Sequence, residues 1–168
     1  SIAQHFLCGA MAASSALPSA KAFAVVNVYS SGDPTRMSST IQLPYQASIF
    51  ATHQRLKETG ALVLADHVLM VCRCRAEVST HPGVRVVWFN CSEIDAVARG
   101  KGLNGPALYK MIAFGMATYS RVLVLDLDTY ISADIRGAFQ LPAPGMVRWE
   151  STVAGPFQPN SGVILAAP

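Results

Sequence analysis

The sequence lacks several features that would place it in a large class at once. No run of about 18 apolar residues occurs, so the sequence predicts no transmembrane segment. Charged residues make up only 14%, and the net charge of +3 is scattered, which argues against a nucleic-acid partner. Apolar residues make up 51% of the 168, enough to bury the core of one globular domain.

Cysteine is also scarce, and its spacing excludes the common metal motifs. The four cysteines, Cys8, Cys72, Cys74 and Cys91, contain no Cys-x-x-Cys step, and no pair of histidines lies near them in the sequence. Cys72 and Cys91 lie in or just after apolar runs that read as strands. Such positions favour buried free thiols.

The amino-terminal residues follow no clear pattern. Residues 6–20 are small and apolar, but no basic segment precedes them, and Met11 resembles an ordinary translation start. We expect residues 1–21 to be a disordered or non-native leader and residues 22–168 to form one domain. A start at Met11 favours a cytoplasmic protein. The faintly signal-like Leu17-Pro-Ser-Ala20 leaves the Golgi and secretory route as the alternative.

Hydrophobic patterning predicts an α/β fold. The longer apolar runs that read as buried strands span residues 22–29, 67–72, 84–89 and 122–125, with shorter strands at 146–149 and 163–165. The helical patterns span residues 45–59 and 106–119, with a helical turn at 134–139. Strands that alternate with helices predict βαβ units and a Rossmann-like, doubly wound, mostly parallel sheet.

The chain is organised around the apolar run Val122–Leu125, which leads directly into Asp126 and Asp128. Side chains alternate along an extended chain, so both carboxylates are expected on one side and Leu127 on the other. Ligands of open α/β sheets bind beyond the carboxyl ends of strands, where this pair falls. Two converging carboxylates repel each other unless a cation or a proton lies between them, and Mn²⁺ or Mg²⁺ is the natural guest. In an equally open alternative, one Asp caps the next turn and the other is solvated.

The helix expected before this strand is almost entirely apolar. Lys110 is the only charged side chain between Lys101 and Arg121. A buried ammonium is strongly unfavourable without an anion, so we expect Asp126, Asp128 or a bound phosphate to meet it.

Two motifs in this part of the chain resemble a known family. The sequence Tyr119-Ser-Arg-Val-Leu-Val-Leu-Asp-Leu-Asp-Thr129 and the later Asn160-Ser-Gly-Val-Ile-Leu165, in this order, resemble glycosyltransferase family eight, the glycogenin-like family. Asp134-Ile135 and Phe139 match that family's intervening turn. A competing resemblance is the DxDxT motif of haloacid-dehalogenase-type phosphatases. Thr129 lies one place too early for that motif, and Tyr130 occupies the position it needs.

The family resemblance implies a GT-A-like nucleotide-diphospho-sugar transferase domain. It implies a metal-dependent, retaining transferase that moves a hexose, such as glucose, from a UDP-sugar to a glycan or protein acceptor. It also implies Mn²⁺ or Mg²⁺ bound by Asp126 and Asp128. The donor-binding positions that it implies are Val26, Val28, Tyr29, Tyr45, Lys110, Asp126, Leu127, Asp128, Asn160 and Ser161. For Tyr45, stacking on a uracil and simple packing under a loop are equally open.

The later motifs of that family do not occur here. Relatives continue with an acidic segment and with a His-x-x-Gly-x-x-Lys-Pro-Trp-like segment, which supplies a metal-ligating His and a diphosphate-binding Lys. All four histidines, His5, His53, His67 and His81, precede the DxD motif. The resemblance therefore covers residues 22–168 as the amino-terminal portion of the family domain, and it assigns no catalytic residue. A non-catalytic, nucleotide-sugar-binding remnant is the alternative function.

Overall fold

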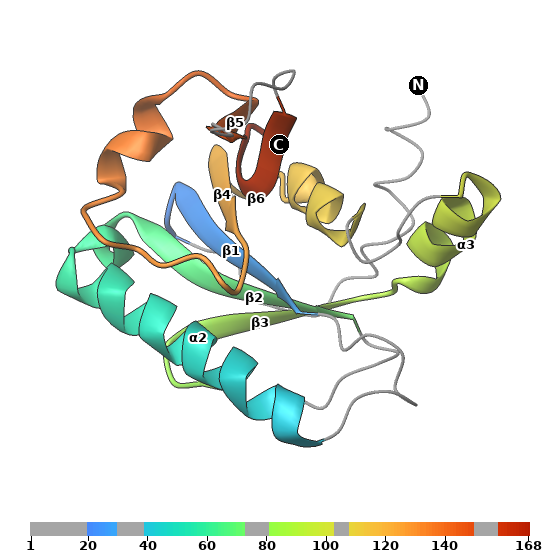
Figure 1. Ribbon diagram of the computed structural model, residues 1–168. Coiled ribbons are helices and arrows are strands. Elements are labelled where there is room, and N and C mark those ends of the chain that lie inside the picture. The colour runs from blue at the N-terminus through green and yellow to red at the C-terminus, as the bar shows by residue number, and fades with distance from the viewer. Residues whose placement is uncertain (1–19, 30–38, 73–80, 103–107, 150–157) are drawn as a thin grey trace.

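The computed structural model describes residues 20–29, 39–72, 81–102, 108–149 and 158–168, without the side chains of 39–45, 147–149 and 158–161. Its centre is a six-stranded sheet with the strand order β3-β2-β1-β4-β6-β5 (Figure 1). The strands are β1 (Phe23–Tyr29), β2 (Ala65–Cys72), β3 (Val84–Phe89), β4 (Arg121–Leu125), β5 (Gly145–Trp149) and β6 (Gln158–Ala166). The first four are mutually parallel, whereas β6 runs antiparallel to both β4 and β5. This mixed, mostly parallel sheet confirms the α/β prediction.

Helices cover both faces of the sheet. The helix α2 (Ser39–Glu58) and the 3-10 helix η3 (Arg136–Gln140) pack on one face, which we call the α2 face. On the opposite face, α3 (Ser92–Gly100) and the 3-10 helix η2 (Tyr109–Gly115) pack against β1, β2 and β4, so we call it the η2 face. A short 3-10 turn, η1 (Ala61–Val63), leads into β2.

Three helical predictions need correction. The helix α2 begins at Ser39, well before the predicted residue 45, and it continues through Pro44 although the missing N–H of that proline removes one intrahelical hydrogen bond. The helix predicted over 106–119 is, in its described part, a shorter 3-10 stretch that ends at Gly115. The helix α3 was not predicted, although Ile94 and Ala98, four residues apart, bury one of its faces.

The strand predicted at 163–165 is also longer than expected. The strand β6 extends back to Gln158, and its backbone pairs with both β4 and β5. Asn160 and Ser161 therefore lie within a strand rather than in a turn before one. Among the described strands, Pro159 pairs only with Arg148 of β5, because the pairing of β6 with β4 begins at Val163, and a proline is tolerated at such an edge position.

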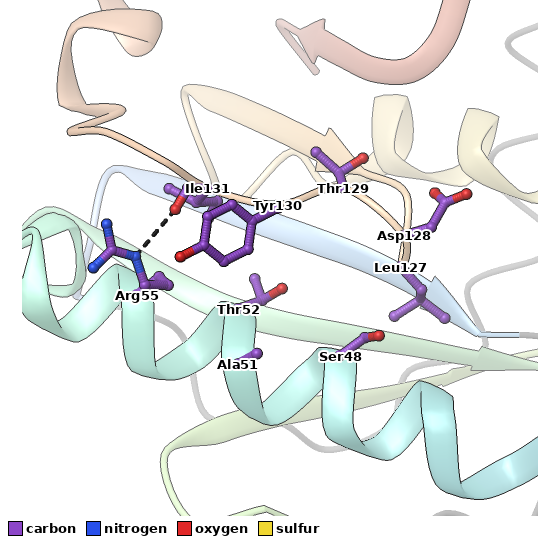
Figure 2. A pocket seen from close by; sticks show the side chains of 9 residues that line it. All are labelled: Ser48, Ala51, Thr52, Arg55, Leu127, Asp128, Thr129, Tyr130 and Ile131. Carbon is purple, nitrogen blue, oxygen red and sulfur yellow. Dashed lines mark hydrogen bonds between the residues drawn. The ribbon is translucent and has the colours of Figure 1, made fainter.

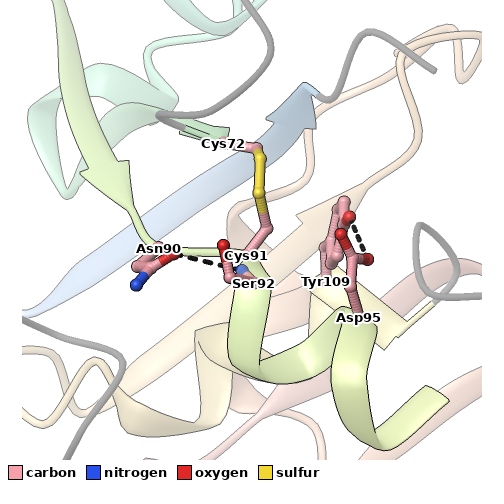
Figure 3. Close-up of a disulfide and its surroundings, with 6 residues drawn as sticks. All are labelled: Cys72, Asn90, Cys91, Ser92, Asp95 and Tyr109. Atoms are coloured by element: carbon pink, nitrogen blue, oxygen red, sulfur yellow. Dashed lines mark hydrogen bonds between the residues drawn. A yellow bond between two sulfur atoms is a disulfide. The ribbon is translucent and has the colours of Figure 1, made fainter. Parts of the chain in front are cut away.

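The prediction of free thiols at Cys72 and Cys91 is wrong, because these residues form a disulfide (Figure 3). Their Cα atoms are 5.6 Å apart, and both side chains are buried. The strands β2 and β3 pair so that Cys72 lies opposite Phe89, and Cys91 follows two residues later. The strand register, which no spacing rule reports, brings the two sulfur atoms together.

Candidate functional site

The candidate site lies where the carboxyl ends of β1 and β4 meet. From β1 the sheet continues through β2 and β3 on one side and through β4 on the other. Where connections leave neighbouring parallel strands in opposite directions, a crevice opens beyond their carboxyl ends, and α/β proteins bind ligands there. The pairing of β1 with β4 stops at Asn27 and Leu125. Val28 and Tyr29 therefore continue β1 beyond the end of β4, beside the DxD segment.

The DxD segment itself is a turn rather than an extended strand. The backbone N–H of Thr129 donates to the carbonyl of Asp126 at 3.0 Å, and β4 has already ended at Leu125. The expectation that strand alternation aligns Asp126 with Asp128 therefore does not apply. Leu127 packs on the α2 face beside the apolar cluster that contains Tyr29.

The second motif holds this turn in place. The carbonyl of Gly162 accepts a hydrogen bond from the backbone N–H of Asp126 at 2.8 Å and one from the Thr129 hydroxyl at 3.5 Å. The two stretches that the sequence singled out thus lie together through their backbones. The side chains of Asn160 and Ser161 lie outside the described part of the structure, as does that of Tyr45.

Lys110 reaches the same turn from the η2 face. Its Nζ forms an ion pair with Oδ1 of Asp126, and the exposed fractions of the two side chains are 15% and 33%. The expectation that an anion meets this lysine is confirmed, and Asp126 is that anion. Because solvent screens such a partly buried pair weakly, the charge of Asp126 is largely compensated within the protein.

Asp128 differs from Asp126 in its surroundings. It is exposed, and it has no ion pair or hydrogen bond with any residue that the structure describes. The described ranges also contain no group of three His, Cys, Asp or Glu side chains that could hold a metal ion. Mg²⁺ is commonly bound by only one or two carboxylates together with substrate phosphates and water, and Mn²⁺ suits the same oxygen ligands. Two carboxylates at this crevice fit that kind of site.

A small pocket lies next to the DxD turn (Figure 2). Its volume is about 120 Å³, and α2 forms one wall with Ser48, Ala51, Thr52 and Arg55. The chain from Leu127 to Ile131 forms the opposite wall. No motif in the sequence indicated this pocket, because it depends on the angle at which the chain leaves the turn across α2.

Arg55 fixes that angle. Its Nε donates to the carbonyl of Ile131 at 3.1 Å and its NH2 group to that of Ser132 at 3.3 Å. The same guanidinium pairs with Glu58 at 2.6 Å and lies 6.0 Å from the ring centroid of Tyr130. The wall opposite α2 is therefore tied to the helix by backbone hydrogen bonds as well as by packing.

Behind the site, a row of polar side chains crosses the α2 face, of which Asn27 and His67 are buried and His53 is half-buried. We call His53, His67 and Asn27 the polar row. Nδ1 of His53 lies 3.2 Å from Nδ1 of His67, and Nε2 of His67 lies 2.8 Å from Oδ1 of Asn27. The amide nitrogen of Asn27 donates to the carbonyl of Leu125 at 2.8 Å. The row therefore ends on the last residue of β4, directly before Asp126.

The partners of the polar row fix its tautomers. Because the Asn27 nitrogen donates to Leu125, its oxygen accepts, and Nε2 of His67 must carry the proton. Neutral His67 then accepts at Nδ1 from His53. Burial, together with the imidazoles of His53 and His81, lowers the pKa of His67 to about 3. Burial also lowers the pKa of His53. The lowered pKa values of His53 and His67 favour neutral imidazoles in the polar row.

The remaining predicted positions have mixed exposure. Val26 is buried and pairs with Val68 and Val124 on its two sides, whereas Val28 is half-buried at the crevice. Tyr29 is only 4% exposed and belongs to an apolar cluster. Contact of any of these residues with a nucleoside stays a prediction.

Comparison with known proteins adds no family to these observations. No protein-family model matches the chain, and no match was found among curated proteins. Within the described ranges, no helix combines the length and the apolar composition that crossing a bilayer would require.

Proposed function

We propose that this chain is the donor-binding part of a metal-dependent, retaining glycosyltransferase that uses a UDP-sugar. The donor would lie in the crevice between β1 and β4, and a hexose such as glucose would pass to a glycan or protein acceptor. The observation that carries the proposal is the DxD turn at this crevice, with Asp126 paired to Lys110 and Asp128 open to solvent.

The difference between the two carboxylates supports a divalent cation together with a diphosphate. Asp126 and Asp128 are the residues that would hold Mn²⁺ or Mg²⁺, and the bound ion would act as a Lewis acid that stabilises the UDP leaving group. Lys110 limits the repulsion between the two carboxylates because it compensates the charge of Asp126. The hydrogen bond from the backbone N–H of Asp126 to the carbonyl of Gly162 ties the turn to β6, which supports a preformed donor site.

Calorimetric titration of UDP into the protein, with and without Mn²⁺, tests the proposal. We expect binding that requires the metal and that weakens by about tenfold or more in Asp128→Asn, because half of the carboxylate ligands is lost. Asp134→Asn is the matched control. Asp134 is also an exposed aspartate, but it pairs with Arg136 at 2.6 Å and lies outside the crevice.

Three results would count against the donor site. They are no binding of UDP, binding of UDP that is equally strong without Mn²⁺, or an equal loss of UDP affinity in Asp128→Asn and Asp134→Asn. A second measurement separates an enzyme from a non-catalytic remnant. The protein is incubated with UDP-glucose, Mn²⁺ and a glucan acceptor such as maltotriose, and release of UDP is followed with time. If UDP binds in a metal-dependent way but no UDP is released from UDP-glucose, the proposed donor site stands and the proposed transferase activity of this chain is rejected.

A further inference from the structure

The pocket beside the DxD turn contains a polar group that the proposed donor site does not use. Thr52 is 5% exposed, and its hydroxyl has no hydrogen-bond partner among the described residues. The Thr52 hydroxyl is not among the buried side-chain atoms that lack a partner, because the pocket leaves it accessible. A molecule bound in the pocket can therefore replace water as its hydrogen-bond partner (Figure 2).

The pocket also presents an aromatic ring. Tyr130 is 71% exposed, so its ring is open to contact with a bound molecule. Arg55 lies 6.0 Å from the ring centroid and holds the adjacent Ile131 through a backbone hydrogen bond. The ring is therefore kept at the pocket while most of its surface stays available.

Charge and size restrict what the pocket can take. Its only cationic side chain, Arg55, is already engaged by Glu58, Ile131 and Ser132, and the Asp128 carboxylate on the rim repels anions. A volume of about 120 Å³ is well below the roughly 300–1,000 Å³ of sites for drug-sized ligands, so a whole nucleotide does not fit. A small, neutral molecule with hydroxyl groups and one apolar face remains.

We propose that this pocket binds one ring of a neutral saccharide. The apolar face of the ring lies against Tyr130, and its hydroxyl groups bond to Thr52 and Asp128. A carboxylate has about four acceptor sites, so a sugar hydroxyl and a metal ion can share Asp128. The role of the saccharide as acceptor in transfer rests on the proposed function. The binding of the saccharide to the pocket is independent of that function.

Amide NMR titrations with maltotriose, cellotriose and lactose, without UDP or metal, test the binding. We expect at least one probe to cause saturable shifts at residues 48–55 and 127–131. Tyr130→Ala is expected to weaken that binding by about fivefold, because a single aromatic contact is lost. Thr52→Val removes the hydroxyl at nearly constant volume and should also weaken binding, whereas Thr52→Ser should restore it.

Phe50→Ala is the matched control. Phe50 is an aromatic residue on the same helix and is 52% exposed, but it does not line the pocket. Saturable shifts elsewhere, equal losses in Phe50→Ala and Tyr130→Ala, or no saturable shift with any probe would overturn the proposal. If the protein binds a saccharide but not UDP, the saccharide site stands and the donor site is rejected. Failure of one proposal can therefore be told from failure of the other.

Discussion

The two faces of the sheet bury similar kinds of side chain but organise them differently. On the η2 face, the buried apolar residues form one continuous cluster. On the α2 face they form two clusters, and the polar row runs between them. Asn27 lies between Val25 and Tyr29 on β1, and His67 lies between Ala65 and Leu69 on β2.

This difference separates two kinds of contribution to the fold. A continuous apolar cluster tolerates small shifts, because apolar contacts have little directionality. The polar row is more sensitive to such shifts, because each buried donor or acceptor that loses its partner costs about 1–3 kcal/mol. The polar row on the α2 face therefore fixes how β4 ends beside β1. That is the position of the candidate site.

The largest expected effect comes from interrupting the polar row. Asn27→Leu leaves the Nε2–H of His67 and the carbonyl of Leu125 without side-chain partners. The free energy of unfolding should therefore fall by about 4 kcal/mol. Urea denaturation measures this change. The double variant Asn27→Leu/His67→Leu makes the α2 face continuous and should recover part of the loss. If both variants are equally unstable, the comparison between the two faces fails.

The disulfide gives the next effect, on the opposite face. Cys72→Ala/Cys91→Ala should lower the free energy of unfolding by about 3 kcal/mol, because the loop between positions 19 residues apart is no longer closed in the unfolded chain. Denaturation with and without a reducing agent provides the control. The wild-type protein should lose a similar amount in the reducing agent, and the variant should lose nothing.

Acid should destabilise the α2 face in particular. His67 has a folded pKa of about 3 and an unfolded value of 6.5, so the unfolded chain binds more protons between these two values. Stability therefore falls as the pH falls, by up to about 1.4 kcal/mol per pH unit from this residue. The double variant Asn27→Leu/His67→Leu should show a shallower slope between pH 6 and 4 in denaturation curves, by roughly the contribution of one proton. An unchanged slope would show that His67 is not the group responsible.

The smallest effect separates the two aspartates. Asp126→Asn removes the ion pair between Asp126 and Lys110 and should cost about 1–2 kcal/mol. Asp128 has no partner among the described residues, so Asp128→Asn should change stability by less than about 0.5 kcal/mol. Thermal denaturation of both variants is sufficient. Equal losses would contradict the different surroundings of the two carboxylates.

The sequence predicted those features that depend on local patterns. The apolar runs located the parallel strands, and the isolated charge of Lys110 predicted an anionic partner, which is Asp126. Features that depend on how distant segments align were missed. The Cys72–Cys91 bond requires the register of β2 and β3, and the polar row requires α2 to lie across β2 and β1. The turn after β4 was one of two open alternatives, and the hydrogen bond from Asp126 to Gly162 could not be predicted because it comes from a remote strand.

The disulfide has a consequence for how this protein is prepared. Cytosolic thiol systems keep cysteines reduced, whereas the bacterial periplasm and the endoplasmic reticulum allow a bond such as Cys72–Cys91 to form and persist. Protein made in a reducing host would begin as the dithiol form, which lacks one connection between β2 and the start of α3. Recombinant material should therefore come from an oxidising compartment, with its free thiols counted before any ligand titration.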